Sequence, residues 1–190
     1  VIKKISLDTT RIDKAGHKHF MAKEIAEQPA VIGEALSRYL TADGEIMLPD
    51  PGLDFTKIDR ITMVACGTAF YACLTAKYWF EQIARMPVEV DVASEFRYRE
   101  PPISDRTMAL FVSQSGETAD TLAALRYCAG KADLITSVVN VTESSIARES
   151  NLALPIHAGV EVGVASTKAF TCQLTVLFLV VLKAAVDRGA

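Results

Sequence analysis

The chain has 190 residues, of which 50% are hydrophobic and 23% charged, and its formal net charge is −3. A chain this apolar is not intrinsically disordered, and its length suits one generous domain. Because acidic and basic residues nearly balance, neither a nucleic acid nor an anionic membrane is an expected partner, and an anionic ligand must be held by local geometry.

The first 55 residues come before any strand pattern. Residues 1–17 are polar and mixed, and we interpret them as a linker or terminal segment. From His19 to Leu40 apolar residues recur at three- and four-residue spacing, which predicts a helix that Pro29 should kink or divide. Residues 41–57 contain two glycines and two prolines, Gly44, Pro49, Pro51 and Gly52, and we expect a loop there. Residues 18–55 are thus predicted to form an N-terminal helical segment.

From residue 56 onward, short apolar runs alternate with helical stretches. Strands are predicted at 61–65, 87–92, 107–112, 134–139 and 152–156. Helices are predicted at 70–84, 118–129 and 167–186, with short helical turns at 93–99 and 144–149. Apolar runs that do not alternate with polar residues indicate strands buried on both faces, and intervening helices indicate parallel pairing. We therefore predict an α/β fold over residues 56–190, a doubly wound, mainly five-stranded parallel sheet flanked by helices.

The longest apolar stretch, Leu174–Val186, is interrupted by Thr175 and Lys183. It is too short to span a bilayer, which takes about 20 apolar residues. Its apolar side chains lie all around the predicted helix, so we expect that helix to be buried on every side. A single sheet can cover only one side of such a helix, and a second chain could cover the rest. The chain is therefore predicted to self-associate.

The cysteines and histidines give no sign of a disulfide framework or a zinc site. No two cysteines have C-x-x-C spacing, and His17, His19 and His157 are not at zinc-ligand spacing from any of them. We expect free thiols, no metal and no cofactor. The first ten residues lack the apolar stretch of a signal peptide, which favours a cytoplasmic location.

The sharpest local signal is Ser-Gln-Ser-Gly-Glu-Thr at 113–118, between a predicted buried strand and a predicted helix. Free backbone N–H groups at a helix start attract anions, Gly116 allows close approach, and three hydroxyls can donate to phosphate oxygens. The loop has neither the lysine of a Walker A loop nor the G-x-G-x-x-G pattern, so a small phosphorylated metabolite fits better than a nucleotide. Ordinary helix capping is the competing interpretation.

Two further segments repeat this chemistry at the same predicted sheet edge. Cys66-Gly67-Thr68 follows the first strand, and Val164-Ala165-Ser166-Thr167 precedes the last helix. Carboxyl ends of parallel strands meet at one edge, so these loops should ring a cleft with hydroxyls and amides, a lining that suits a sugar phosphate. Cys66 is expected to be buried and Lys168 to be solvated. Glu117 is expected in the first turn of a helix, where the helix dipole stabilises a carboxylate.

Several segments resemble one enzyme family closely. They are ACGT at 65–68, YWFE at 78–81, ASEFRYR at 93–99, SQSGETADTL at 113–122, GVASTKAFTCQLTVL at 163–177 and KHFMAKEIAEQP at 18–29. The first five are similar to the isomerase portion of glutamine–fructose-6-phosphate aminotransferases, also called glucosamine-6-phosphate synthases, and the segment at 18–29 is similar to the part that leads into it. The resemblance covers about residues 18–190 and implies the SIS (sugar isomerase) fold.

That resemblance also implies a division of roles. The family makes glucosamine 6-phosphate from fructose 6-phosphate with ammonia from a separate glutaminase domain, and its isomerase portion holds two SIS subdomains, of which this chain is similar to the first. Sugar-phosphate contacts are implied for Thr68, Ser113, Gln114, Ser115, Thr118, Val164 and Ser166, with Cys66, Gly67 and Gly116 close by. Ala69 stands where the family usually has serine, so one ligand hydroxyl is expected to be absent.

The catalytic acid and base of the family belong to its second SIS subdomain, so no catalytic residue is expected in this chain, and a homodimer is the expected assembly. Two alternatives belong to other classes. A SIS-fold sugar-phosphate sensor would carry a DNA-binding partner domain, and residues 1–55 lack the necessary basic cluster. A stand-alone sugar-phosphate isomerase would need its own proton-transfer base, for which the sequence offers no convincing candidate.

Overall fold

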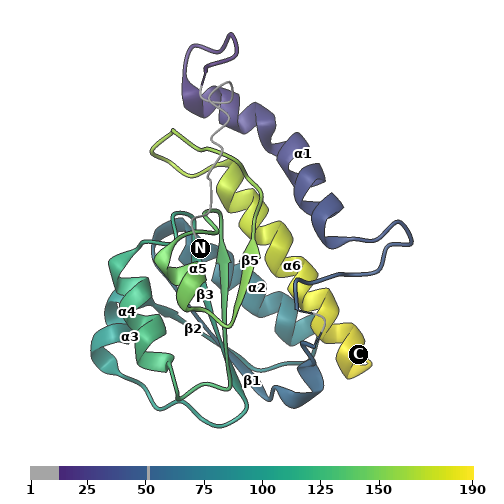
Figure 1. The fold of residues 1–190 in the computed structure, drawn as a ribbon, viewed down its shortest axis with the longest axis vertical. Coiled ribbons are helices and arrows are strands. Elements are labelled where there is room, and N and C mark those ends of the chain that lie inside the picture. Colours follow the sequence, from purple (N-terminus) through teal and green to yellow (C-terminus); the bar gives the residue numbers. More distant parts are fainter. Residues whose placement is uncertain (1–12, 51) are drawn as a thin grey trace, which may run out of the picture.

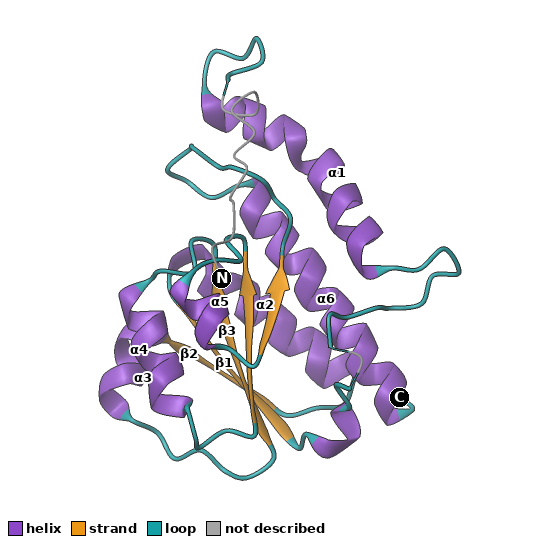
Figure 2. Ribbon diagram, in the orientation of Figure 1, coloured by secondary structure: helices purple, strands orange, loops and turns teal. Residues whose placement is uncertain are grey.

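The computed structural model describes residues 13–50 and 52–190, so the predicted linker at 1–17 lies largely outside the described residues. A five-stranded parallel sheet forms the centre, with the order β2-β1-β3-β4-β5 (Figure 2). Its strands are β1 (Arg60–Ala65), β2 (Val88–Val92), β3 (Thr107–Ser113), β4 (Leu134–Val139) and β5 (Leu152–Pro155). Each lies within one or two residues of its predicted bounds, and the predicted doubly wound α/β fold is confirmed.

Helices cover both faces of the sheet (Figure 1). The helices are α1 (Phe20–Tyr39), α2 (Gly67–Ile83), α3 (Ala93–Arg99), α4 (Ala119–Cys128), α5 (Ser145–Glu149) and α6 (Lys168–Arg188), with a short 3-10 helix, η2, at Phe55–Lys57. One face carries α2 and α6, with α1 packed on the outside of α6, and the other carries α3, α4 and α5. The N-terminal half of α1 extends past the carboxyl edge of the sheet (Figure 1).

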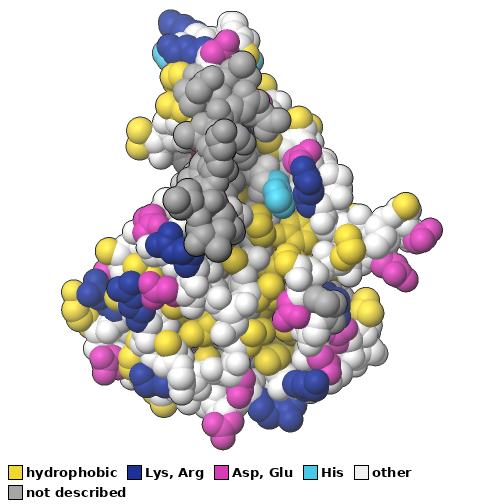
Figure 3. Space-filling model, viewed as in Figure 1, with side chains coloured by type: hydrophobic (Ala, Val, Ile, Leu, Met, Phe, Trp, Pro, Cys, Tyr) yellow, Lys and Arg dark blue, Asp and Glu magenta, His cyan; other side chains and the backbone are white. Residues whose placement is uncertain are grey.

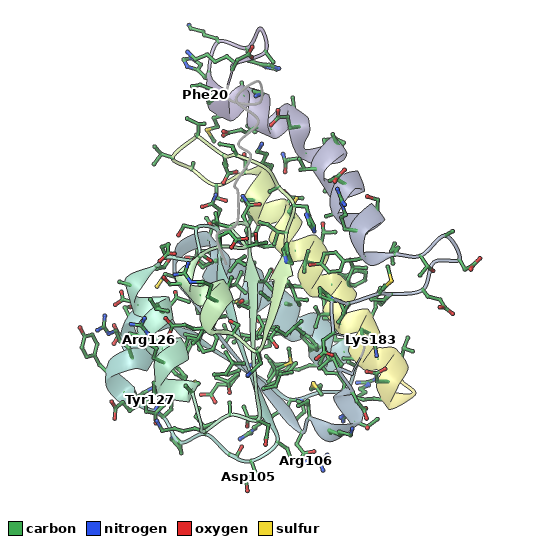
Figure 4. The ribbon with its side chains drawn as sticks, viewed as in Figure 1. Phe20, Asp105, Arg106, Arg126, Tyr127 and Lys183 are labelled. Atoms are coloured by element: carbon green, nitrogen blue, oxygen red, sulfur yellow. The ribbon has the colours of Figure 1, made fainter. Side chains whose placement is uncertain are left out.

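Successive residues of β1 supply two separate cores. Ile61, Met63 and Ala65 pack on the side of α2 and α6. Val64 points to the opposite face and packs with α3 and α4. On this second face, Tyr127 of α4 stacks edge-on against Phe96 of α3 and donates its hydroxyl to two carbonyls just beyond α3 (Figure 4). Burial on both faces explains why the strands are continuous apolar runs.

The order of the strands changes direction between β1 and β3. From β1 it passes outward to β2, returns to β3 on the opposite side of β1, and continues to β4 and β5. In open parallel sheets, ligands bind beyond the carboxyl ends of the strands at such a switch point. The loops after Ala65 and Ser113, which the sequence singled out, begin there.

Two helices differ from their predicted form. Pro29 does not divide α1, which runs unbroken through it. The proline is exposed, and residues of α1 just before it, Glu27 and Gln28, bond to Lys168 and Thr171 of α6, so contacts with α6 hold the helix next to the missing N–H. Residues 93–99 form a helix of seven residues where a polar connector or single turn was expected.

The expectation that α6 is buried on every side is wrong in part. Most of its apolar residues are buried, but Phe178 is 37% exposed and Val186 73% exposed. By length and composition α6 could cross a membrane, yet 56% of its apolar window is buried inside this fold, as in the core helix of a globular domain. In Figure 3 hydrophobic side chains gather over the region of β5 and α6.

Candidate functional site

A pocket of about 330 Å³ opens at the carboxyl edge of the sheet beyond β1 and β3. Residues from three separate segments line it: the start of α2, the 113–118 loop, and the loop before α6. All seven predicted contact residues are among them, namely Thr68, Ser113, Gln114, Ser115, Thr118, Val164 and Ser166. Residues up to 98 positions apart in the sequence thus meet at one site, as the parallel topology predicted.

Hydroxyls of the 113–118 loop are held by the loop itself. The Ser113 oxygen accepts a hydrogen bond from the Gly116 backbone N–H at 3.0 Å and lies 3.0 Å from the Thr118 hydroxyl. The Ser115 oxygen accepts one from the Glu117 N–H at 3.2 Å. A serine whose oxygen accepts a backbone N–H keeps its own proton to donate. Ser115, and one of the Ser113–Thr118 pair, can therefore donate to a bound anion.

Gly116 shapes this loop without lining the pocket. Its φ is +66°, and a Cβ there would lie 2.0 Å from the Oγ of buried Ser144, which is too close for any side chain. Only glycine fits both the left-handed backbone and the approach to Ser144. The residue expected near the site therefore acts through backbone shape.

Two helices direct open N-termini toward the pocket. Cys66 precedes α2 and Thr118 precedes α4, and neither caps its helix with its side chain. The first-turn N–H groups and the positive ends of both helix dipoles are left for a ligand. Cys66 was expected to be buried, but its side chain is half-buried and lines the pocket, because a residue just before a helix start lies at the sheet edge.

The loop before α6 differs from the other two segments because a carboxylate already caps its helix, which the sequence analysis did not predict. The Glu161 carboxylate caps α6, accepting from the N–H groups of Thr167 at 2.9 Å and Ala169 at 3.2 Å. It also accepts from the Ser166 hydroxyl at 3.2 Å. This helix start is already neutralised, and Ser166 has its proton engaged. A negative charge on this side of the pocket disfavours a phosphate here and leaves the α2 and α4 termini for it.

Helix α1 holds the same loop from outside. Glu24, only 2% exposed, accepts hydrogen bonds from the backbone N–H of Val162 at 2.6 Å and of Gly163 at 3.1 Å. Lys168 was expected to be solvated, but it is 5% exposed and donates to Glu27 of α1 at 2.7 Å. Burial would raise the pKa of Glu27, but the hydrogen bond and charge of Lys168, with help from Lys23, hold it below its usual value.

Glu117 also has a structural partner. Its Oε1 accepts from the backbone N–H of Ser145 at 2.6 Å, which keeps the pKa of this carboxyl below its usual value. The sequence predicted a carboxylate favoured by a helix start, and the structure shows that the helix is α5 and not α4. Fixed in this way, Glu117 stays ionised and does not line the pocket.

Gln173 and Ala69 line the pocket as well, and the sequence analysis did not predict Gln173. A glutamine inside an otherwise apolar helix was the available signal. Across residues 13–50 and 52–190 no group of three or more His, Cys, Asp or Glu side chains is arranged to hold a metal ion. The pocket thus offers hydroxyls, helix N-termini, the side-chain amides of Gln114 and Gln173, and the Glu161 carboxylate.

The sequence matches the SIS domain over residues 54–183, well over half of the chain. The chain belongs to the SIS domain family. This SIS domain is 58% identical, over 94% of its length, to glutamine–fructose-6-phosphate aminotransferase (isomerizing) of Brucella abortus, and 57% identical, over 98%, to that of Bradyrhizobium diazoefficiens. It spans 30–31% of the length of these relatives.

Solved structures of similar proteins share the fold of this SIS domain. The C-terminal domain of glucosamine-fructose-6-phosphate aminotransferase from Francisella tularensis superposes with a TM-score of 0.89 and 43% identity, over 93% of this chain and 51% of that one. Glucosamine-6-phosphate deaminase from Thermotoga maritima, with a TM-score of 0.72 and 24% identity, covers 88% of this chain and 49% of that one. The second likeness shows the fold alone.

Proposed function

We propose that this SIS domain holds fructose 6-phosphate as the first isomerase subdomain of a glutamine–fructose-6-phosphate aminotransferase. The observation that carries the proposal is the meeting of two uncapped helix N-termini with the 113–118 hydroxyls in one pocket. The identity of 56–58% to curated aminotransferases supports the choice of sugar phosphate.

The phosphate would lie at the 113–118 loop. There it receives hydroxyl protons from Ser115 and the Ser113–Thr118 pair, and the N–H groups that begin α4. The sugar would extend toward Thr68 and the loop before α6, where Val164 and Ser166 line the pocket. Because the Ser166 proton is donated to Glu161, its oxygen is left to accept a hydrogen bond from a sugar hydroxyl.

Chemistry on this substrate needs groups from elsewhere in a larger enzyme. Conversion between ketose and aldose moves a proton between neighbouring carbons, which requires a positioned base, and opening the sugar ring requires an acid. The carboxylate in the pocket, Glu161, is occupied in capping α6, and Glu117 is held by α5. We propose that the acid and base come from a second SIS subdomain and the ammonia from a glutaminase domain.

The assembly and location of the protein are part of the same proposal. The curated relatives are about three times as long as this chain, which leaves room for both missing domains. Partly exposed Phe178, with Trp79 against it and Leu174 half-buried beside it, gives α6 an apolar surface that a second copy would cover. We propose a cytoplasmic homodimer, with no nucleic acid and no membrane as partner.

Calorimetric titration tests the function directly. Fructose 6-phosphate and glucosamine 6-phosphate should bind, and unphosphorylated fructose should bind far more weakly. Ser115→Ala should weaken sugar-phosphate binding by about 1–3 kcal/mol, the usual loss for a hydrogen bond to a charged group. Ser37→Ala makes the same change on the exposed face of α1 and should have no effect. Equal affinity for fructose and fructose 6-phosphate would contradict the phosphate assignment.

A further inference from the structure

Gln173 is a buried glutamine whose side-chain oxygen has no partner among the described residues. Its side chain is 1% exposed, and its Oε1 has no hydrogen-bond partner among the described residues. Three other buried oxygens share that condition, those of Thr121, Thr136 and Ser137, and none of them belongs to a residue that lines the pocket. A buried acceptor left unpaired lowers the stability of the fold, and of these four oxygens only that of Gln173 belongs to a residue lining a pocket in which a ligand can supply the donor.

We propose that Gln173 recognises the sugar part of the substrate: its side chain lines the pocket, and a turn of the terminal amide brings the oxygen, sealed from solvent in the free protein, to accept a hydrogen bond from a sugar hydroxyl. This inference rests on the proposed function and adds a contact that the motifs do not include. Gln173 lies one helical turn after Ala169, whose N–H bonds to Glu161, so it lines the pocket from within α6 and not from the cap of that helix.

The chemistry of the amide oxygen selects the part of the ligand. A phosphate dianion has no proton to donate, so an unpaired acceptor cannot bind it, whereas a sugar hydroxyl can donate. The nearby hydroxyl of Ser166 also presents an acceptor, because its own proton is donated to Glu161. Gln173 and Ser166 thus form an acceptor side of the pocket, opposite in character to the donor-rich 113–118 loop.

The test replaces the amide without emptying its space. Gln173→Met keeps an unbranched side chain of similar length and removes both polar atoms. Binding of fructose 6-phosphate and of inorganic phosphate is measured by calorimetry on the 190-residue chain, and the ligand-free protein is melted. Gln82→Met, an exposed glutamine on α2, is the matched control.

We expect Gln173→Met to weaken the binding of fructose 6-phosphate about tenfold and to leave the binding of inorganic phosphate unchanged. The melting temperature of the free protein should rise by roughly 2–4 °C, since an unpaired buried group is removed. The control should change none of these. Unchanged sugar-phosphate affinity, or a lower melting temperature with both ligands weakened equally, would overturn the inference while the proposed function stands. If the unaltered chain binds phosphate but no sugar phosphate, the proposed function and this inference fail together.

Discussion

Glu24 holds Gly163 with both of its carboxylate oxygens, each 3.1 Å from the Gly163 backbone nitrogen. The two residues are 139 positions apart in the sequence. A Cβ on Gly163 would lie 2.5 Å from a Glu24 oxygen, so the contact requires glycine at this position. The N-terminal helix therefore belongs to the pocket, because it fixes the loop that carries Val164 and Ser166.

Replacing this carboxylate should loosen that loop. Glu24→Gln leaves one acceptor oxygen and turns an amide N–H₂ toward backbone donors, so we expect a loss of about 1–3 kcal/mol in the free energy of unfolding. Urea denaturation measures it, with Glu95→Gln on the exposed face of α3 as control. Equal stability of the two variants would show that the loop does not depend on α1.

Gly116 allows a test of how the 113–118 loop is packed. Gly116→Ala should destabilise the protein by more than about 2 kcal/mol, because strain at positive φ is joined by overlap with Ser144. Gly130→Ala has a similar φ of +74° and nothing within 4 Å of the new Cβ, so it should cost only about 1 kcal/mol. Adding Ser144→Gly to Gly116→Ala should restore part of the loss, and no recovery would refute the overlap.

Stability should fall on acidification through His157. Burial lowers the pKa of this half-buried imidazole, the Arg38 charge lowers it further, and Glu34 opposes them. Since the unfolded chain binds the proton more readily, this contribution is complete above about pH 6.5, the ordinary histidine value, and is lost as the pH falls through the folded pKa.

Denaturation midpoints between pH 8 and pH 5 measure this effect. His157→Gln should flatten the acid side of the stability profile, whereas the same change at exposed His17 should leave the wild-type profile in place. Identical slopes for all three proteins would assign the acid sensitivity to other groups.

The apolar surface of α6 predicts self-association. Phe178 meets Trp79 edge-on with ring centroids 5.2 Å apart, and it is 37% exposed. Phe178→Glu should weaken self-association at least tenfold in sedimentation velocity, because it places a charge in an apolar contact. Tyr98→Glu, on the 77% exposed tyrosine of α3, is the control. A wild-type chain that stays monomeric at tens of micromolar, the range we would test, would rule the surface out.

Binding without turnover is the fifth expectation. The purified chain, incubated with fructose 6-phosphate with and without ammonium, should form neither glucose 6-phosphate nor glucosamine 6-phosphate. Its pocket provides ground-state contacts, and acceleration needs groups that act in the transition state. Turnover that survives stringent purification and disappears in Glu161→Gln, or in Glu117→Gln, would place the catalytic base in this chain.

Local sequence determined the strands and most of the residues that line the pocket. Continuous apolar runs such as 107–112 have one good outcome, a strand buried on both faces, and the polar residues that follow it must lie at the sheet edge. The partners of charged residues could not be read in this way. Lys168 and Glu161 look like ordinary helix-start and loop residues, but Lys168 is buried against Glu27 of α1, and Glu161 caps α6 because of the return path of the chain.

Segment 156–167 runs back over the carboxyl edge of the sheet, from β5 at one side to α6, which packs against α2. It is anchored through backbone N–H groups at Val162 and Gly163, and the Val162 and Val164 side chains are exposed. Val164 lines the pocket, so mutations there change its wall without disturbing the packed interior. Under the proposed function, the sugar preference of the pocket should change by drift in this one segment, and directed evolution should begin there.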